Sequence, residues 1–443
     1  MPASKLPAAN NLDNEKRSFA DVVHQSLSFD SSEESSRLIL ELLDTRWVQR
    51  LRRIRQTGNT HLVYMYAEHS RFGHSLGVAY LASLLMSQLE NRHRTQIREF
   101  RNAVAAAALL HDLGHTAPGS HLAEHIWNPD IKGQHEKISV RVVKEDAEIQ
   151  GILSRYGREL GSQVAAILSG SAEVPRWTRD IISGDGWNAD RGNWSIVDSA
   201  MCCVHYGRYN VHALIDAFRL TDNEELVIQE NRLDALTHFF VARDSMYRQV
   251  YQHRVLQAVD ALTEKVALRL RDVIENEGAD NSRLFLDESM IEVIAAKNRI
   301  HFLPLTDIYN MTDNWWYYHN ERWCQCEDPV LRDLSSRLID RRLLKTLRMP
   351  SDKLEKEQLL RQLHHTCESL GFEPRYYLST VSSSDLHRKK LESPPKVMLE
   401  SGKIVSVTDV EPMIASILEK SSIPREWVVV PRAVKEHWAK MYI

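Results

Sequence analysis

Apolar residues recur at helical spacing through most of the chain, from about residue 36 to 345. Leu43, Trp47, Leu51 and Ile54, for example, follow the three- to four-residue steps of an amphipathic helix. The segment 103–110, AVAAAALL, has no polar residue on any side, which predicts a helix that is buried all round. The pattern therefore predicts a mainly α protein.

The two ends of the chain depart from this pattern. Residues 1–35 are polar and close with SFDSSEESS, which predicts a flexible N-terminal tail. Residues 36–350 form the helical region, to which we assign the catalytic chemistry below. Residues 351–443 alternate strand-like and helical segments, and we expect a small α+β appendage there.

Composition narrows the class of protein. Hydrophobic residues make up 43% and charged residues 26% of the chain, as in ordinary globular proteins. The net charge of −4 gives no global sign of a nucleic-acid or membrane binder. We find no run of 18 apolar residues and no apolar signal-peptide core, so we expect a cytoplasmic protein with no membrane partner. The five scattered cysteines favour reduced thiols over a disulfide framework.

Histidines gather in the segment 109–125, LLHDLGHTAPGSHLAEH. Its adjacent His111 and Asp112 combine an imidazole with a carboxylate, which suits a transition metal or acid–base chemistry. Neighbours on a helix point about 100° apart, but both side chains can reach one ion above the helix end. Alone, the dipeptide is common, and a solvated helix end is the simpler interpretation.

Two flanking motifs change this interpretation. RFGHSLG places Arg71 and His74 one helical turn apart, and NADRGNWSIVDS places Asp190, Trp194 and Asp198 on one helical face. The order R-F-x-H-S-L, a buried Ala/Leu helix and then H-D-x-G-H resembles the HD-domain phosphohydrolases. More narrowly, it resembles the deoxynucleoside triphosphate (dNTP) triphosphohydrolases, which include bacterial dGTPases. The resemblance can be followed from about residue 36 to 345 and implies an HD-type helical fold.

The resemblance implies a metal-dependent hydrolase with a defined ligand set. His74, His111, Asp112 and Asp190 match the positions that hold the metal, which would be manganese, iron, zinc or nickel. This ion would act as a Lewis acid at the α-phosphate, and Mg²⁺ would accompany the nucleotide. Hydrolysis would release a deoxynucleoside and intact tripolyphosphate.

The same resemblance implies proton-handling and phosphate-binding positions. His115 would bind an α-phosphate oxygen, and His121 or His135, oriented by Glu124, would protonate the leaving 5′-oxygen. HDLGHTAPGSH carries one residue more than the family pattern in this stretch.

The remaining implied positions bind the substrate. They are Arg71, Arg191 and Arg243 for the triphosphate, Gln56 and Trp194 at the sugar, Asp198 on the same helical face, and Tyr251 toward the base. Four positions differ from the family, namely Thr57 for a Leu, Trp194 for a Tyr, Asn193 for an Asp and Val197 for an Arg. These differences bear on which sugar or base fits.

Partners and regulation follow from the resemblance alone. Asp44 and Arg52 match positions that bind a regulatory guanine nucleotide between subunits of a homo-oligomer, although the basic run around Arg52 is also consistent with a solvated helix face. The aromatic run 314–323, NWWYYHNERW, is consistent with stacking on the bases of single-stranded nucleic acid, but a packed helix is the favoured interpretation.

Two other functions stay open. The first is an HD-type phosphodiesterase or nuclease acting on another nucleotide or a DNA end. The second is a non-catalytic nucleotide-binding protein that keeps the metal site for structure.

Overall fold

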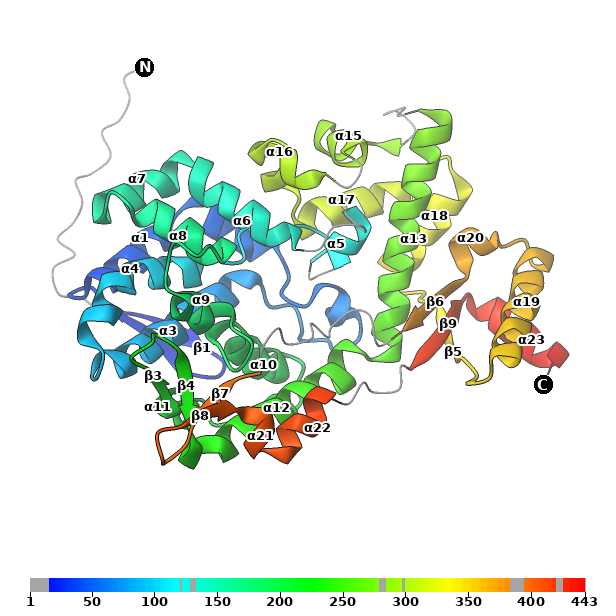
Figure 1. Ribbon diagram of the computed structural model, residues 1–443. Helices are drawn as coiled ribbons and strands as arrows, with labels where there is room; N and C mark the ends of the chain where they lie inside the picture. Colours follow the sequence, from blue (N-terminus) through cyan, green and yellow to red (C-terminus); the bar gives the residue numbers. More distant parts are fainter. Residues whose placement is uncertain are drawn as a thin grey trace, which may run out of the picture.

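The computed structural model describes residues 16–119, 122–127, 133–278, 284–296, 299–382, 394–419 and 425–442. Helices dominate it, which confirms the predicted fold class (Figure 1). The first half contains α1 (Glu34–Leu43), α2 (Arg46–Arg50), α3 (Arg71–Glu90), α4 (Arg94–Leu110), α5 (Leu122–Trp127), α6 (Gln134–Glu145), α7 (Ala147–Tyr156), α8 (Leu160–Ser169), α9 (Arg176–Ser183) and α10 (Ala189–Met201).

The second half begins with α11 (Val211–Ala217), α12 (Leu233–Met246) and the long α13 (Arg254–Glu277). It continues with α15 (Glu288–Ala295), α16 (Leu305–Asn310), α17 (Asp313–Trp323), α18 (Pro329–Ile339), α19 (Lys353–Ser369), α20 (Pro374–Tyr377), α21 (Val407–Val410), α22 (Pro412–Glu419) and α23 (Arg432–Tyr442). Short 3-10 helices include η1 (Leu51–Arg53) and η2 (Gly58–Leu62), and a π-helical turn, η4 (Tyr247–Tyr251), joins α12 to α13.

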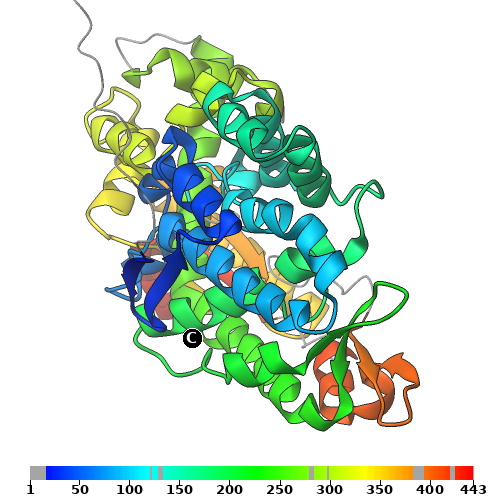
Figure 2. The same ribbon diagram turned by 90° about the vertical axis from the view of Figure 1, so that its left-hand side faces the viewer.

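Helix α4 lies at the centre of the core. Its segment 103–110 is buried on every side, as the absence of polar residues predicts. The helix packs against α1, α3, α8 and α9, and it ends at Leu110, directly before His111. Figure 2 shows the blue helices of the first part of the chain side by side, and α3 and α4 are in contact. The core therefore fixes the position at which the His–Asp pair begins.

The N-terminal segment differs from the predicted tail. Residues 1–15 lie outside the described residues, but β1 (Lys16–Asp21) and β2 (Gln25–Asp30) form an antiparallel hairpin. Leu27 and Phe29 of this hairpin are buried against the core. The polar composition concealed a short alternation in SLSF, in which every second residue is apolar and faces inward.

The C-terminal strands join two separate sheets. β9 (Glu426–Val430) lies between β5 (Lys345–Arg348) and β6 (Ser379–Ser382), beside α19 and α23. β7 (Lys396–Met398) and β8 (Ile404–Ser406) extend β3 (Phe218–Leu220) and β4 (Leu226–Gln229), which belong to the helical region. The predicted α+β content is present, and β7 pairs directly with the helical region instead of lying in a separate unit.

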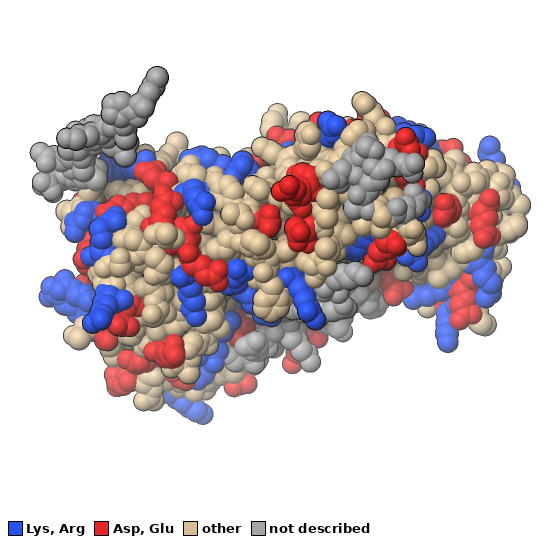
Figure 3. Space-filling view, turned by 90° about the horizontal axis from the view of Figure 1, so that it is seen from above, with Lys and Arg blue, Asp and Glu red and all other residues tan. Residues whose placement is uncertain are grey.

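The surface carries charges of both signs without a single-sign field on the face seen in Figure 3. The aromatic run 314–323 lies in α17, and its Trp315, Trp316 and Trp323 are buried, which confirms the packed-helix interpretation. Among the described residues, no helix is both long and apolar enough to cross a membrane.

Candidate active site

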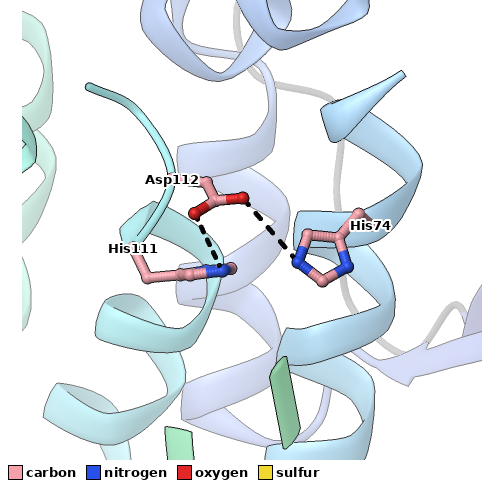
Figure 4. A group of neighbouring side chains, drawn as sticks. All are labelled: His74, His111 and Asp112. Carbon is pink, nitrogen blue, oxygen red and sulfur yellow. Dashed lines mark ion pairs between the residues drawn. The ribbon is translucent and has the colours of Figure 1, made fainter. Parts of the chain in front are cut away.

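The residues predicted to bind metal come together from three helices. His74 lies in the first turn of α3, His111 and Asp112 follow α4, and Asp190 lies in the first turn of α10. His74 Nε2 lies 3.1 Å from Asp190 Oδ1 and 3.7 Å from Asp112 Oδ2, and His111 Nε2 lies 3.2 Å from Asp112 Oδ1. Figure 4 shows His74, His111 and Asp112 pointing toward one another.

The hydrogen bonds around these residues fit a divalent cation. His74 Nδ1 donates to Asn193 Oδ1 at 2.9 Å, and His111 Nδ1 donates to the Ala108 carbonyl at 2.9 Å. Both bonds direct Nε2 toward the carboxylates, as the outer hydrogen bonds of metal-binding histidines do. The two Nε2 atoms are buried and have no hydrogen-bond partner among the described residues. Nitrogen and carboxylate ligands together suit manganese, iron, zinc or nickel.

Arg71 adds positive charge beside this group. Its Nη1 donates to Asp112 Oδ2, and both side chains are buried. Burial alone would raise the pKa of Asp112, but His111, Arg71 and His115 together lower it well below its usual range. Asp112 is therefore an anion at neutral pH, ready to bind a cation.

A second histidine pair lies beside Asp112. The rings of His115 and His135 are stacked, with centroids 4.1 Å apart, and His115 Nε2 lies 3.4 Å from Asp112 Oδ1. His135 Nδ1 donates to Glu124 Oε1 at 2.5 Å. The predicted proton donor His121 lies outside the described residues.

The two stacked histidines have opposite pKa shifts. Burial, with the positive charges of Arg71 and His135, lowers the pKa of His115 well below its usual value. Burial also opposes the charge of His135, but Glu136 and Glu124 outweigh it and raise the pKa. The pair therefore combines a His115 that stays neutral with a His135 that keeps its proton to higher pH than an ordinary histidine, an arrangement that suits a phosphate ligand beside an acid.

Both groups open into one cavity. Arg71, Asp112, His115, His135 and Asp190 line it, together with Gln56, Trp194, Asp198 and Tyr251. Asp198 accepts hydrogen bonds from His69 Nε2 at 2.7 Å and from the Tyr251 hydroxyl at 2.5 Å. The Trp194 ring packs edge-on against the Tyr251 ring. The residues predicted to hold sugar and base thus lie in the same cavity as Asp112 and Asp190, two of the four predicted metal ligands.

Two predicted phosphate-binding arginines lie elsewhere. Neither Arg191 nor Arg243 lines the cavity. Arg191 donates to the carbonyls of Gly184 and Gly186, and Arg243 lies over the Tyr247 ring at 4.9 Å. Reaching a triphosphate would require Arg191 to give up these carbonyl bonds.

The two predicted regulatory residues are both exposed. Asp44 pairs with Arg17 at 3.5 Å, and Arg52 lies over the Phe72 ring at 3.5 Å. Their solvent exposure leaves them accessible to a ligand.

Several positioning residues carry no signal in the sequence pattern. Ser139 Oγ donates to the His111 carbonyl at 2.8 Å and accepts from the Gly114 amide at 2.9 Å. A Cβ on Gly114 would lie 2.0 Å from the His135 carbonyl oxygen, so only glycine fits between the two histidine segments. Asn193 is another such residue, because in the sequence it stands out only as an Asn where the family has an Asp. Each acts on a partner distant in sequence, which periodicity cannot reveal.

Comparison with known proteins gives the class. Residues 71–176 match the HD domain family model, and residues 210–300 match that of the HD associated region. The fold resembles the crystal structure of a phosphohydrolase from Bacteroides thetaiotaomicron, with a TM-score of 0.79, 24% identity and coverage of 94% of this chain and 100% of the other. The chain therefore contains an HD domain followed by an HD associated region, on the fold of a solved phosphohydrolase.

Sequence relatives refine the placement. The uncharacterized protein YwfO of Bacillus subtilis is 28% identical over 382 residues, which cover 84% of this chain and 81% of YwfO. Human deoxynucleoside triphosphate triphosphohydrolase SAMHD1 is 30% identical over 280 residues, which cover 56% of this chain and 44% of the human enzyme. The chain is thus a homologue of dNTP triphosphohydrolases and matches less than half of the human enzyme's length.

Proposed function

We propose that this protein is a metal-dependent dNTP triphosphohydrolase. The observation that carries the proposal is that one cavity joins the His74–His111–Asp112–Asp190 group to the His115–His135–Glu124 group. The first group suits a divalent cation, and the second suits a phosphate ligand beside a proton donor. A phosphoester hydrolase needs both functions within reach of one phosphorus atom.

The proposed reaction is hydrolysis at the α-phosphorus. Water forms a new bond to the α-phosphorus, the bond to the 5′-oxygen breaks, and the products are a deoxynucleoside and tripolyphosphate. A divalent cation held by His74, His111, Asp112 and Asp190 would supply Lewis acidity at the phosphate and lower the pKa of water.

The side chains divide the remaining work. Arg71 neutralises phosphate charge with the guanidinium donors that Asp112 leaves free. Neutral His115 donates a hydrogen bond to an α-phosphate oxygen. Protonated His135, held by Glu124, gives its proton to the leaving 5′-oxygen. His121 is the other candidate for this last step.

The substrate's sugar and base would occupy the remainder of the cavity. Gln56 and Trp194 would contact the sugar, with Tyr251 toward the base and Asp198 orienting Tyr251 through their hydrogen bond. Arg191 and Arg243 would bind the distal phosphates after side-chain rearrangement. Mg²⁺ would accompany the nucleotide.

We also propose a homo-oligomer in which Asp44 and Arg52 bind a regulatory guanine nucleotide. Their exposure supports this assignment. The test is to add GTP or dGTP and measure turnover and oligomer size. An Arg52→Glu variant that responds like the wild type would contradict it.

Product analysis tests the catalytic proposal. Purified protein is incubated with each dNTP, each ribonucleotide and single-stranded DNA in Mn²⁺ or Mg²⁺, and the products are separated by chromatography. Deoxynucleoside with tripolyphosphate, lost in Asp112→Asn, supports the proposal. Monophosphate or shortened oligonucleotides would identify a phosphodiesterase or nuclease instead.

A further inference from the structure

The cavity has a further polar wall that the roles above do not use. Thr57 and Asn59 lie at the start of η2, and Asp260 lies in α13, which packs against η2. All three line the same cavity as Asp112 and His115. A nucleotide whose phosphates reach Asp112 would therefore share its cavity with this wall.

Asp260 is held in place through one of its two oxygens. Asn59 Nδ2 donates to Asp260 Oδ1 at 3.0 Å and to Thr263 Oγ1 at 3.0 Å, which uses both amide protons. Asp260 Oδ2 has no donor among the described residues, and the side chain is partly accessible through the cavity. Burial raises the pKa of Asp260 to about 7, so above neutral pH the carboxyl group presents a fixed and free acceptor.

Two neighbouring oxygens also lack partners. Gln56 Oε1 and Thr57 Oγ1 are buried without a hydrogen-bond partner in the described part of the chain, and their residues are only 8% and 7% exposed. Buried polar groups are nearly always hydrogen-bonded, so each of these is accounted for by a ligand or water in the cavity. By resemblance Gln56 contacts the sugar, so Thr57 and Asp260 remain as polar cavity groups without an assigned role.

We propose that Asp260 and Thr57, with Asn59 holding Asp260, read the nucleobase and select bases that present N–H donors, guanine above all. The inference rests on the proposed function. The free carboxylate oxygen of Asp260 only accepts, the Thr57 hydroxyl can accept as well as donate, and the amide protons of Asn59 are already used. Guanine presents two adjacent donors, its N1–H and its 2-amino group. Thymine presents a single N–H between two carbonyl oxygens, and these would face the carboxylate and be repelled.

The test compares kcat/KM for the four dNTPs in the wild type, Asp260→Asn and Glu264→Gln. The Asp260→Asn side chain keeps an oxygen for the Asn59 amide and replaces the free acceptor with a donor. Glu264→Gln makes the same charge change one turn further along α13, where the side chain lines a separate groove. A merely structural defect would lower activity on every dNTP alike, so the readout is the ratio of dGTP to dTTP.

We expect the wild type to prefer dGTP and Asp260→Asn to lower the dGTP:dTTP ratio by about ten- to a hundredfold, the effect of one buried charge-assisted hydrogen bond. The ratios are measured well above pH 7, where Asp260 is ionised with or without the nearby charge of Glu264, and there the Glu264→Gln ratio should equal that of the wild type. An unchanged ratio in Asp260→Asn would overturn the inference while leaving the proposed function intact.

Failure of the proposed function has a different signature. If the wild type hydrolyses no dNTP, calorimetric affinities of dGTP and dTTP for the wild type and Asp260→Asn test the wall separately. A dGTP preference that Asp260→Asn removes would support the wall, and equal affinities for the two nucleotides in the wild type would refute it.

Discussion

Arg50 donates from Nη1 to the carbonyl oxygen of His115 at 2.8 Å. The Arg50 side chain is completely buried, and its five N–H groups reach five backbone carbonyls, those of Leu113, His115, Ile308, Tyr309 and Met311. Burial lowers the pKa of Arg50 to about 9, which leaves it charged at neutral pH. One guanidinium thus joins the loop after the His–Asp pair to the segment before α17.

Arg50→Lys should destabilise the protein and impair the site. An ammonium group has three donors, so at least two buried carbonyls lose their partner, at a cost of roughly 3 kcal/mol in unfolding free energy. Urea denaturation measures this loss. Arg53→Lys, an exposed neighbour, is the matched control and should change the unfolding free energy by less than about 0.5 kcal/mol. Equal stabilities of the two variants would contradict the assignment.

Asn193 should set the metal affinity through His74. Asn193→Ala removes the acceptor for His74 Nδ1 and should weaken metal binding by about 10- to 100-fold. Asn193→Asp keeps that acceptor and should bind metal much more tightly than the alanine variant. Metal titration followed by calorimetry gives both affinities, and similar values for the two variants would exclude this role.

A substitution at Gly77 tests the same hydrogen bond between His74 and Asn193 independently. A Cβ at Gly77 would lie 2.2 Å from Asn193 Nδ2, so Gly77→Ala must displace the Asn193 side chain. We expect a loss of metal affinity in the direction of Asn193→Ala. Gly73→Ala, one turn earlier in α3 and with open space at its Cβ, is the control and should bind metal like the wild type.

Metal removal should abolish hydrolysis reversibly. A chelator should reduce turnover to background, and added Mn²⁺ should restore it. Asp112→Asn and Asp190→Asn should resist this rescue, because each replaces an anionic ligand with a neutral one. Glu90→Gln, which changes a partly buried ion pair with Arg101 outside the cavity lining, serves as the control. Chelator-resistant turnover would refute metal dependence.

The pH profile should report His135. Its pKa is raised in the folded protein, so the protonated form persists to higher pH than in an ordinary histidine, and activity should fall as the pH rises through the raised pKa. The contribution of His135 to stability follows the same sign, being full below the unfolded pKa and lost as the pH rises through the folded one. Glu124→Gln removes a stabilising carboxylate and should move the alkaline decline of kcat to lower pH. An unchanged alkaline limb would assign the proton to another group, His121 being the first to test.

The sequence alone determined the helical class and most of the candidate ligands. Helical periodicity is local, so α4 and its buried segment 103–110 could be predicted from one stretch of chain. The ligand set also came from short motifs, whose order resembles a known family. The N-terminal hairpin escaped prediction because its apolar alternation is only a few residues long within a polar segment.

Tertiary structure decided what surrounds those residues. Arg50, Ser139 and Asn193 position the site through partners between 25 and 261 residues away in sequence, and no periodicity links such pairs. The opposite pKa shifts of His115 and His135 likewise depend on which charges lie beside each ring after folding. Hydrogen bonding and electrostatics act over a few ångströms of space, whereas sequence patterns report only neighbours along the chain. The sequence therefore identified the candidate site residues, whereas the fold alone determines their protonation, their orientation and the cavity that they share.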